Sequence, residues 1–112
     1  AGTTIVVQDG SGAPATVSAT CDSIRGSGQR RVVRLGLGQS DLVFEAAPYT
    51  GAGAYTPGGN LEVSGGPFSR QDVRALTGAV IFEGAGRSGA INLVGGASSV
   101  SGAWDCSGLP KP

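Results

Sequence analysis

Apolar and polar residues alternate with a period of two along most of this chain, and helical periodicity is nearly absent. In residues 15–21, ATVSATC, Ala15, Val17, Ala19 and Cys21 occupy one set of positions, and Thr and Ser occupy the other. This alternation is typical of a strand with one buried and one solvated face. Similar segments predict eight short strands, at residues 3–8, 15–21, 31–37, 41–47, 60–64, 75–83, 89–94 and 99–106.

Gly-rich turns join these segments at spacings of about ten residues, which is typical of a sandwich or a small barrel. A parallel sheet would need crossover helices, and only residues 69–76, with Ser69 as N-cap, could form even one helical turn. The sequence therefore predicts an all-β fold, an antiparallel β-sandwich or small barrel of about eight strands with one disulfide. We expect a single domain over residues 1–112.

The composition is rich in turn-forming residues, with 21 glycines and 6 prolines among 112 residues. Such a content approaches the level at which disorder becomes the usual interpretation. The formal net charge is zero, however, and Val, Leu, Ile and Phe together number 25. Disordered chains usually have a strong net charge and fewer large apolar residues. We therefore expect a folded domain with one modest core.

The charge balance excludes several classes of partner. Eight basic and eight acidic residues cancel, so the chain has no field that would gather nucleic acid or an anionic membrane. No apolar run approaches the roughly 20 residues that span a bilayer, so no membrane span is expected. The expected partner is another protein or copies of the same chain.

The absence of histidine removes much catalytic chemistry. A Ser-His-Asp or Cys-His nucleophile cannot be built, and histidine ligation of metals is excluded. Paired carboxylates could in principle serve a small hydrolase, but most acidic residues fall at turns or on polar strand faces. We therefore expect solvated surface charges, with no catalytic residues, no metal site and no cofactor.

Cys21 and Cys106 are the only cysteines, and they lack the CxxC spacing of redox and zinc sites. Both fall on predicted inward faces, and Cys106 shares its face with Trp104, which we expect in the core. A disulfide between them would indicate an exported protein, and two buried free thiols are the alternative. The start at Ala1, without a methionine or signal peptide, fits a processed, exported protein, although a trimmed chain would look the same.

The segment PYTGAGAYTPGG, residues 48–59, is predicted as a long, curved loop that contains Tyr49 and Tyr55. Pro48 ends the fourth strand because it lacks a backbone donor, and the glycines allow sharp turns. We expect both rings to lie on the edge of the sandwich with their hydroxyls in water. Contact with a ligand or partner is the alternative, because loops often carry function.

Arg30, Arg31 and Arg34 form the only local cluster of charge. A solvated entrance to the third strand is one interpretation, and a site for an anionic partner is the other. Farther along, GAGRSG at 84–89 has the spacing of a dinucleotide-binding motif, but a strand follows where that motif needs a helix. We therefore expect a hairpin turn there, with Arg87 at its tip.

Three stretches carry a resemblance to known proteins: YTGAGAY (49–55), TGAVIFEGAGRSGAINLV (77–94) and SVSGAWDCS (99–107). With Cys21 and Cys106, they resemble small exported Gly-rich bacterial β-sandwich domains, similar to mycobacterial-type surface lipoprotein antigens. The resemblance spans most of the chain and implies a disulfide-linked β-sandwich at the cell surface. The lipid-bearing N-terminal cysteine of such lipoproteins is missing here, so lipid anchoring does not carry over. The resemblance implies no particular catalysis.

These observations favour a non-catalytic, extracellular or cell-surface domain with a binding or adhesion role. The alternative is a repeating subunit of an extracellular fibre, assembled by strand exchange of the N-terminal strand. In that strand Ile5 and Val7 face one way and Val6 the other, so both faces could be buried in another subunit. Head-to-tail addition of this kind gives filaments, whereas pairing within its own sheet gives a monomer.

Overall fold

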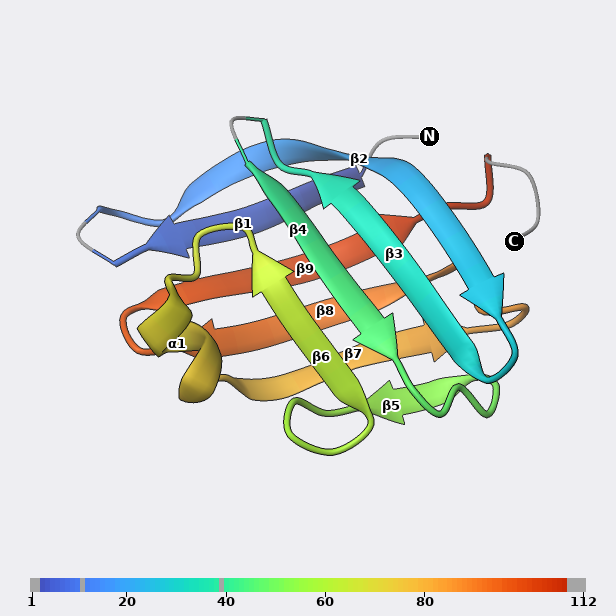
Figure 1. Ribbon diagram of the computed structural model, residues 1–112. Coiled ribbons are helices and arrows are strands. Elements are labelled where there is room, and N and C mark those ends of the chain that lie inside the picture. The colour runs from blue at the N-terminus through green and yellow to red at the C-terminus, as the bar shows by residue number, and fades with distance from the viewer. Residues whose placement is uncertain (1–2, 11, 39, 109–112) are drawn as a thin grey trace.

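The computed structural model describes residues 3–10, 12–38 and 40–108, and its strands form one antiparallel sheet (Figure 1). The order across the sheet is β5-β7-β8-β9-β1-β2-β3-β4-β6, so β5 and β6 are its edges. The strands are β1 (Thr3–Asp9), β2 (Ala15–Ser27), β3 (Arg30–Gly36), β4 (Asp41–Ala46), β5 (Gly53–Tyr55), β6 (Leu61–Gly65), β7 (Thr77–Glu83), β8 (Ser88–Gly95) and β9 (Ser98–Asp105). The predicted all-β, antiparallel fold class is confirmed.

The strand β2 carries the sheet from one layer into another. Residues 15–19 pair with β1, whereas residues 20–27 pair with β3, and the register shifts between Cys21 and Ser23. Such a bulge bends a strand, which lets the sheet fold back over itself. One layer, here called the large layer, contains β5, β7, β8, β9, β1 and the start of β2. The small layer contains the rest of β2 with β3, β4 and β6, and crosses the large layer obliquely (Figure 1).

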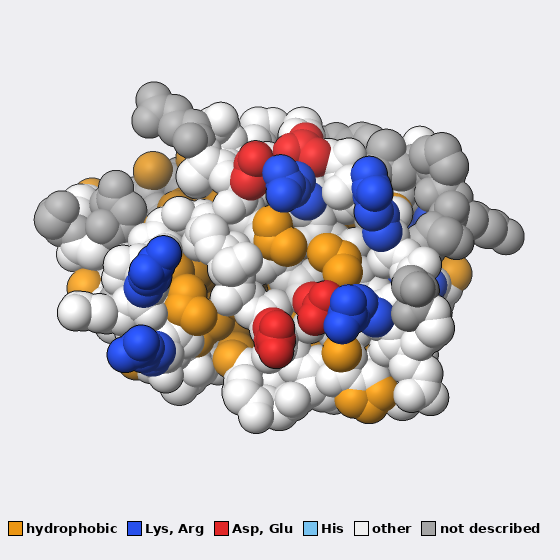
Figure 2. Space-filling model, viewed as in Figure 1, with side chains coloured by type: hydrophobic (Ala, Val, Ile, Leu, Met, Phe, Trp, Pro, Cys, Tyr) orange, Lys and Arg blue, Asp and Glu red, His pale blue; other side chains and the backbone are white. Residues whose placement is uncertain are grey.

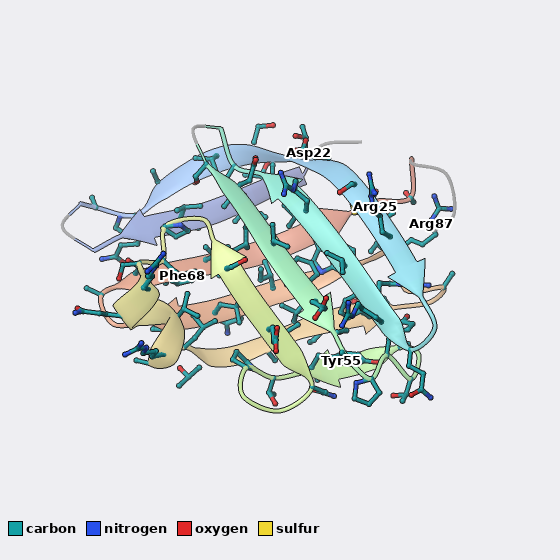
Figure 3. The ribbon with its side chains drawn as sticks, in the orientation of Figure 1. Asp22, Arg25, Tyr55, Phe68 and Arg87 are labelled. Carbon is teal, nitrogen blue, oxygen red and sulfur yellow. A yellow bond between two sulfur atoms is a disulfide. The ribbon has the colours of Figure 1, made fainter. Side chains whose placement is uncertain are left out.

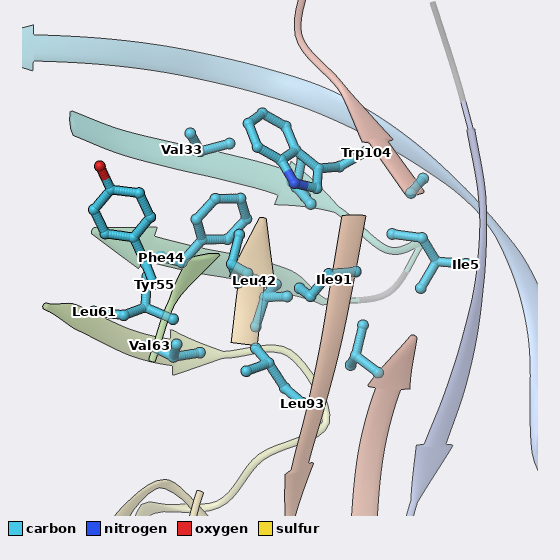
Figure 4. Close-up of a cluster of buried hydrophobic side chains, with 14 of the residues drawn as sticks. Ile5, Val33, Leu42, Phe44, Tyr55, Leu61, Val63, Ile91, Leu93 and Trp104 are labelled. Carbon is cyan, nitrogen blue, oxygen red and sulfur yellow. The ribbon is translucent and has the colours of Figure 1, made fainter. Parts of the chain in front are cut away.

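The core lies between the two layers (Figure 4). Phe44 from β4 meets Phe82 from β7 and Trp104 from β9, with ring centroids 5.1–5.9 Å apart in edge-to-face geometry. The Trp104 indole donates a hydrogen bond to the Ala90 carbonyl oxygen at 3.2 Å, which satisfies its one polar atom. The prediction that Trp104 belongs to the core is therefore confirmed.

Cys21 and Cys106 form a disulfide, with Cα atoms 5.2 Å apart. The bond links the bulged part of β2 to the residue that follows β9, across 85 positions of sequence. The predicted bridge is confirmed, and the free-thiol alternative is wrong. Because disulfides persist in oxidising compartments, the bond indicates a setting outside the reducing cytoplasm.

Several details differ from the predictions. Nine strands occur in the described residues rather than eight, because the short β5 lies inside the predicted 48–59 loop. The strand β2 runs six residues beyond the predicted end at Cys21. The helix α1 (Arg70–Arg74) follows Ser69, as expected, and packs against β6 and β8. Among the described residues, no helix has the length and apolarity that crossing a membrane would require.

The strand β1 lies between β2 and β9 and pairs with both along five residues. Ile5 is fully buried and Val7 half-buried, but Val6 on the opposite face is 39% exposed. Within the single chain only one face of this strand is therefore buried, and burial of the other face in another subunit stays a prediction. One face covers the core, and the other lies on the outside of the large layer.

Candidate binding surface

The two predicted tyrosines close one end of the core rather than standing at its edge. Tyr49 and Tyr55 stack with centroids 5.6 Å apart and planes 14° from parallel, and both meet Phe82 edge-on. Tyr55 is only 2% exposed, and its hydroxyl accepts a bond from the Thr50 amide and donates one to the Gly51 carbonyl oxygen. The prediction that this hydroxyl lies in water is wrong, because its own loop satisfies it.

Arg31 covers the outer side of this aromatic pair. Its guanidinium carbon lies 4.4 Å from the centroid of the Tyr49 ring, within the range of a cation–π contact. One guanidinium nitrogen donates to the carbonyl oxygens of Ala85 (3.1 Å) and Gly86 (2.9 Å) in the β7–β8 turn. Arg31 therefore ties β3, the tyrosine loop and this turn together. Tyr49 is half-buried beneath it, and its role as a partner contact stays a prediction.

The other two arginines of the predicted cluster lie on the opposite face of β3. Arg30 pairs with Glu45 at 3.3 Å, and Arg34 lies 3.7 Å from Asp41. Because successive residues of a strand face opposite ways, Arg31 is separated from both. The three side chains therefore do not form one anion site. Exposed pairs such as these contribute little to stability.

The GAGRSG segment forms a hairpin turn between β7 and β8, as predicted. Arg87, however, does not stand free at the tip. Its guanidinium donates to the Cys106 carbonyl oxygen at 3.4 Å, and the Cys106 amide donates to the Arg87 carbonyl oxygen at 2.7 Å. The side chain therefore lies against the end of β9 (Figure 3).

Arg30 and Arg34, with Glu45 and Asp41, lie on the outside of the small layer, here called the charged face. Figure 2 shows the basic and acidic side chains that gather on this side of the molecule. Val32 and Val43 lie half-buried in its middle, between the two ion pairs. Glu62 on β6 lies opposite Glu45 and adds a further charge. The side chains of Asp9 and Asp72 lie outside the described residues. In the rest of the described chain no cluster of acidic residues and cysteines could hold a metal ion.

The outside of the large layer is different: across its central rows it carries no charged residue. We call this surface the uncharged face. Residues directly opposite each other in paired strands share a face, so the register defines its members. They fall into three rows across the sheet: Thr16, Val6, Ser101, Asn92 and Ala79; Ala103, Ala90, Ile81 and Ala54; Gln8, Ser99, Val94 and Thr77. Thr4 and Ser18 add a further pair.

All three large apolar side chains that are exposed in the described chain lie on the uncharged face: Val6 (39%), Ile81 (40%) and Val94 (44%). The charges resume only at its end, where Glu83 and Asp105 flank Ser88. Hydrogen bonds from Ser107 hold the pKa of Asp105 below its usual range, which favours the charged form of this carboxylate. The uncharged face is therefore a bounded surface.

A hollow of about 720 Å³ opens between the β1–β2 hairpin and the loops that follow β3 and β6. Among the described residues of its lining, Val7, Val17 and Leu37 contribute apolar walls and Ser40 the only side-chain hydroxyl. Small-molecule sites usually add several convergent polar groups that orient the ligand. The described part of the lining lacks such a set, so we regard the uncharged face as the stronger candidate.

The sequence contained a signal for the uncharged face that its interpretation did not use. In residues 3–8, 15–21, 75–83, 89–94 and 99–106 the only charges at the polar or small alternate positions are Glu83 and Asp105, near the ends of their segments. The alternate positions of 31–37 and 41–47 include an arginine and acids. Strand pairing is needed to see that the first group forms one continuous surface.

No family model matches the chain, and no curated protein or solved structure shows significant similarity to it. The resemblance to exported lipoprotein antigens therefore stays a prediction. The binding surface has to be argued from the chain's own geometry.

Proposed function

We propose that this chain is a non-catalytic, exported cell-surface domain that binds a protein partner through its uncharged face. The observation that carries the proposal is the contrast between the two broad faces. One holds Arg30, Glu45, Arg34 and Asp41, whereas the central rows of the other hold only neutral side chains, among them the three exposed apolar residues. Depletion of charge with exposed apolar side chains is the signature of the central part of a protein interface.

The chemistry of the chain supports binding rather than catalysis. It has no histidine, and two of its carboxylates, on Asp41 and Glu45, are already engaged with arginines. Hydrolysis by paired carboxylates needs two acids facing one cleft, one of which is held protonated. Asp105, whose pKa is lowered, is held ionised instead.

Export is supported by the disulfide between Cys21 and Cys106, which would be reduced in most cytosolic compartments. A cell-surface position agrees with the sequence resemblance described above. Fractionation of the producing cells tests this part of the proposal. The protein should be found in the envelope or medium in its oxidised form, and recovery in the cytosol as free thiols would contradict it.

The fibre alternative requires another copy to supply β1. In the single chain this strand already pairs with β2 and β9, and Ile5 fills the core without any exposed surface. We therefore propose binding by the complete domain and not by strand exchange.

Site-specific photo-crosslinking tests the proposed surface. A photoreactive amino acid replaces Ile81 on the uncharged face or, as a matched control, the exposed Ser64 on the charged face, in cells that produce the protein. Position 81 should give adducts of defined mass, and position 64 should give none. Equal labelling from both positions, or no adducts from position 81, would contradict the proposal.

A further inference from the structure

We infer that the uncharged face binds the same face of a second copy of this chain, an inference that rests on the proposed function. We choose a second copy as the binding partner because the charge on this face meets the requirement of a two-fold dimer. In a two-fold dimer the same patch of both subunits meets, so any net charge on it would oppose itself. The central rows of this face carry no charge of either sign, whereas the opposite face carries two ion pairs that would lose water.

The relief of the uncharged face also permits sheet stacking. Each of its three large apolar side chains has small or polar residues opposite it on both neighbouring strands. Ile81 is flanked by Ala54 and Ala90. Val6 is flanked by Thr16 and Ser101, and Val94 by Thr77 and Ser99. Apolar side chains that project from a sheet can interdigitate with those of a second sheet stacked about 10 Å away.

The area is sufficient for a reversible dimer. Five strands with about five residues each, and β5 with fewer, spaced about 4.8 Å apart and rising about 3.4 Å per residue, give a footprint of roughly 450 Å². A pair of such footprints buries about 900 Å², in the range of weak, transient interfaces. We therefore expect a concentration-dependent dimer rather than an obligate one. Interdigitating side chains also explain why this face tolerates exposed valine and isoleucine in a chain of zero net charge.

Sedimentation over a range of protein concentrations tests this inference on the oxidised, full chain. The wild type should approach twice the chain mass of 11.0 kDa as the concentration rises. Ile81→Lys and Asn92→Lys each place a charge on the surface that the dimer would remove from water, and each should weaken the dimer at least about tenfold. Ser64→Lys, on the exposed outside of β6, is the matched control and should sediment as the wild type does.

Ile81 and Asn92 are exposed, so a lysine at either position reaches water in the monomer. Near-ultraviolet circular dichroism of the buried Trp104 verifies that each variant is folded. A wild type that stays monomeric at high concentration overturns the inference. So does a dimer that Ser64→Lys dissociates while Ile81→Lys does not. The crosslinking experiment at position 81 distinguishes a failure of the dimer inference from a failure of the proposed function. Adducts from position 81 to a different protein would overturn the second copy and still support the binding face.

Discussion

A glycine makes room for the aromatic end of the core. A Cβ atom at Gly86 would overlap the Tyr49 hydroxyl and press on the Arg31 guanidinium, and the backbone φ there is +78°. Gly84, in the same turn, has a similar positive φ of +53° but open space where its Cβ would lie. The two positions therefore separate backbone strain from crowding.

We expect Gly86→Ala to destabilise the protein by about 3 kcal/mol, because strain and overlap add. Gly84→Ala carries the strain alone and should cost about 1 kcal/mol. Urea unfolding monitored by fluorescence measures both. Equal losses at the two positions would show that Tyr49 and Arg31 yield without cost.

The neighbouring arginines allow a second comparison at this scale. Arg31→Ala removes two hydrogen bonds to turn carbonyls and the contact with Tyr49, so we expect a loss of about 2 kcal/mol. Arg30→Ala removes only the exposed pair with Glu45 and should cost less than about 0.5 kcal/mol. The same unfolding measurement decides, and a larger loss at Arg30 would contradict the assignment of Arg31 as the structural arginine.

Among the elements, β2 has the largest influence on the architecture. It pairs with β1 in the large layer and with β3 in the small layer, and its bulge lies beside Cys21. The disulfide then ties this bend to the end of β9. A single bent strand and one covalent bond thus hold the two layers in register.

Replacement of both cysteines, Cys21→Ala with Cys106→Ala, should lower the free energy of unfolding by about 4 kcal/mol, because the bridge closes a long loop in the unfolded chain. Urea unfolding of the double variant and of the reduced wild type should agree. In the wild type, alkylation of the denatured but unreduced protein should add no label. Two added labels would mean that the bridge is absent.

Deletion of residues 3–9 tests how β1 is supplied. The structure places β1 between two partners with Ile5 in the core, so the truncated chain should lose its fold. Circular dichroism and sedimentation of the truncated protein report this, and a deletion of residues 109–112 serves as control. A truncated chain that stays folded and soluble, and that binds a synthetic peptide of residues 1–8, would favour the fibre.

At the scale of the whole molecule, the two broad faces of the domain differ in charge. Charged side chains gather on the outside of the small layer (Figure 2). The central rows on the outside of the large layer carry none. Both layers contribute to a single core, in which Phe44 of one layer meets Phe82 and Trp104 of the other.

This shared core predicts one cooperative unfolding transition. The signal of Trp104, which contacts side chains of both layers, should change together with the far-ultraviolet signal of the strands. Thermal or urea unfolding followed by both probes should give coincident curves. Two separate midpoints would show that the layers unfold independently.

Period-two alternation and Gly-rich turns were sufficient to locate eight of the strands and the inward position of Trp104. The alternation is a local property, so it can be read without the fold. The short strand β5 was missed because glycine and proline surround Tyr55, and they indicate a loop wherever they occur. The hydroxyl of Tyr55 was misplaced because its partners, Thr50 and Gly51, belong to the same loop, whose path the pattern does not give.

From the sequence alone follow the antiparallel β class, the buried tryptophan and the loss of histidine chemistry, because each depends on residue types or on their immediate spacing. The sequence favoured a disulfide, but only the structure decided between a bridge and two free thiols, because Cys21 and Cys106 are 85 positions apart. The uncharged face and the separation of Arg31 from Arg30 and Arg34 depend on the tertiary structure. Strand order and register put Val6, Ile81 and Val94 on the same face of the sheet. Both depend on pairings between strands that are distant in the sequence. A surface of this kind is assembled across strands, so no single stretch of the chain contains it.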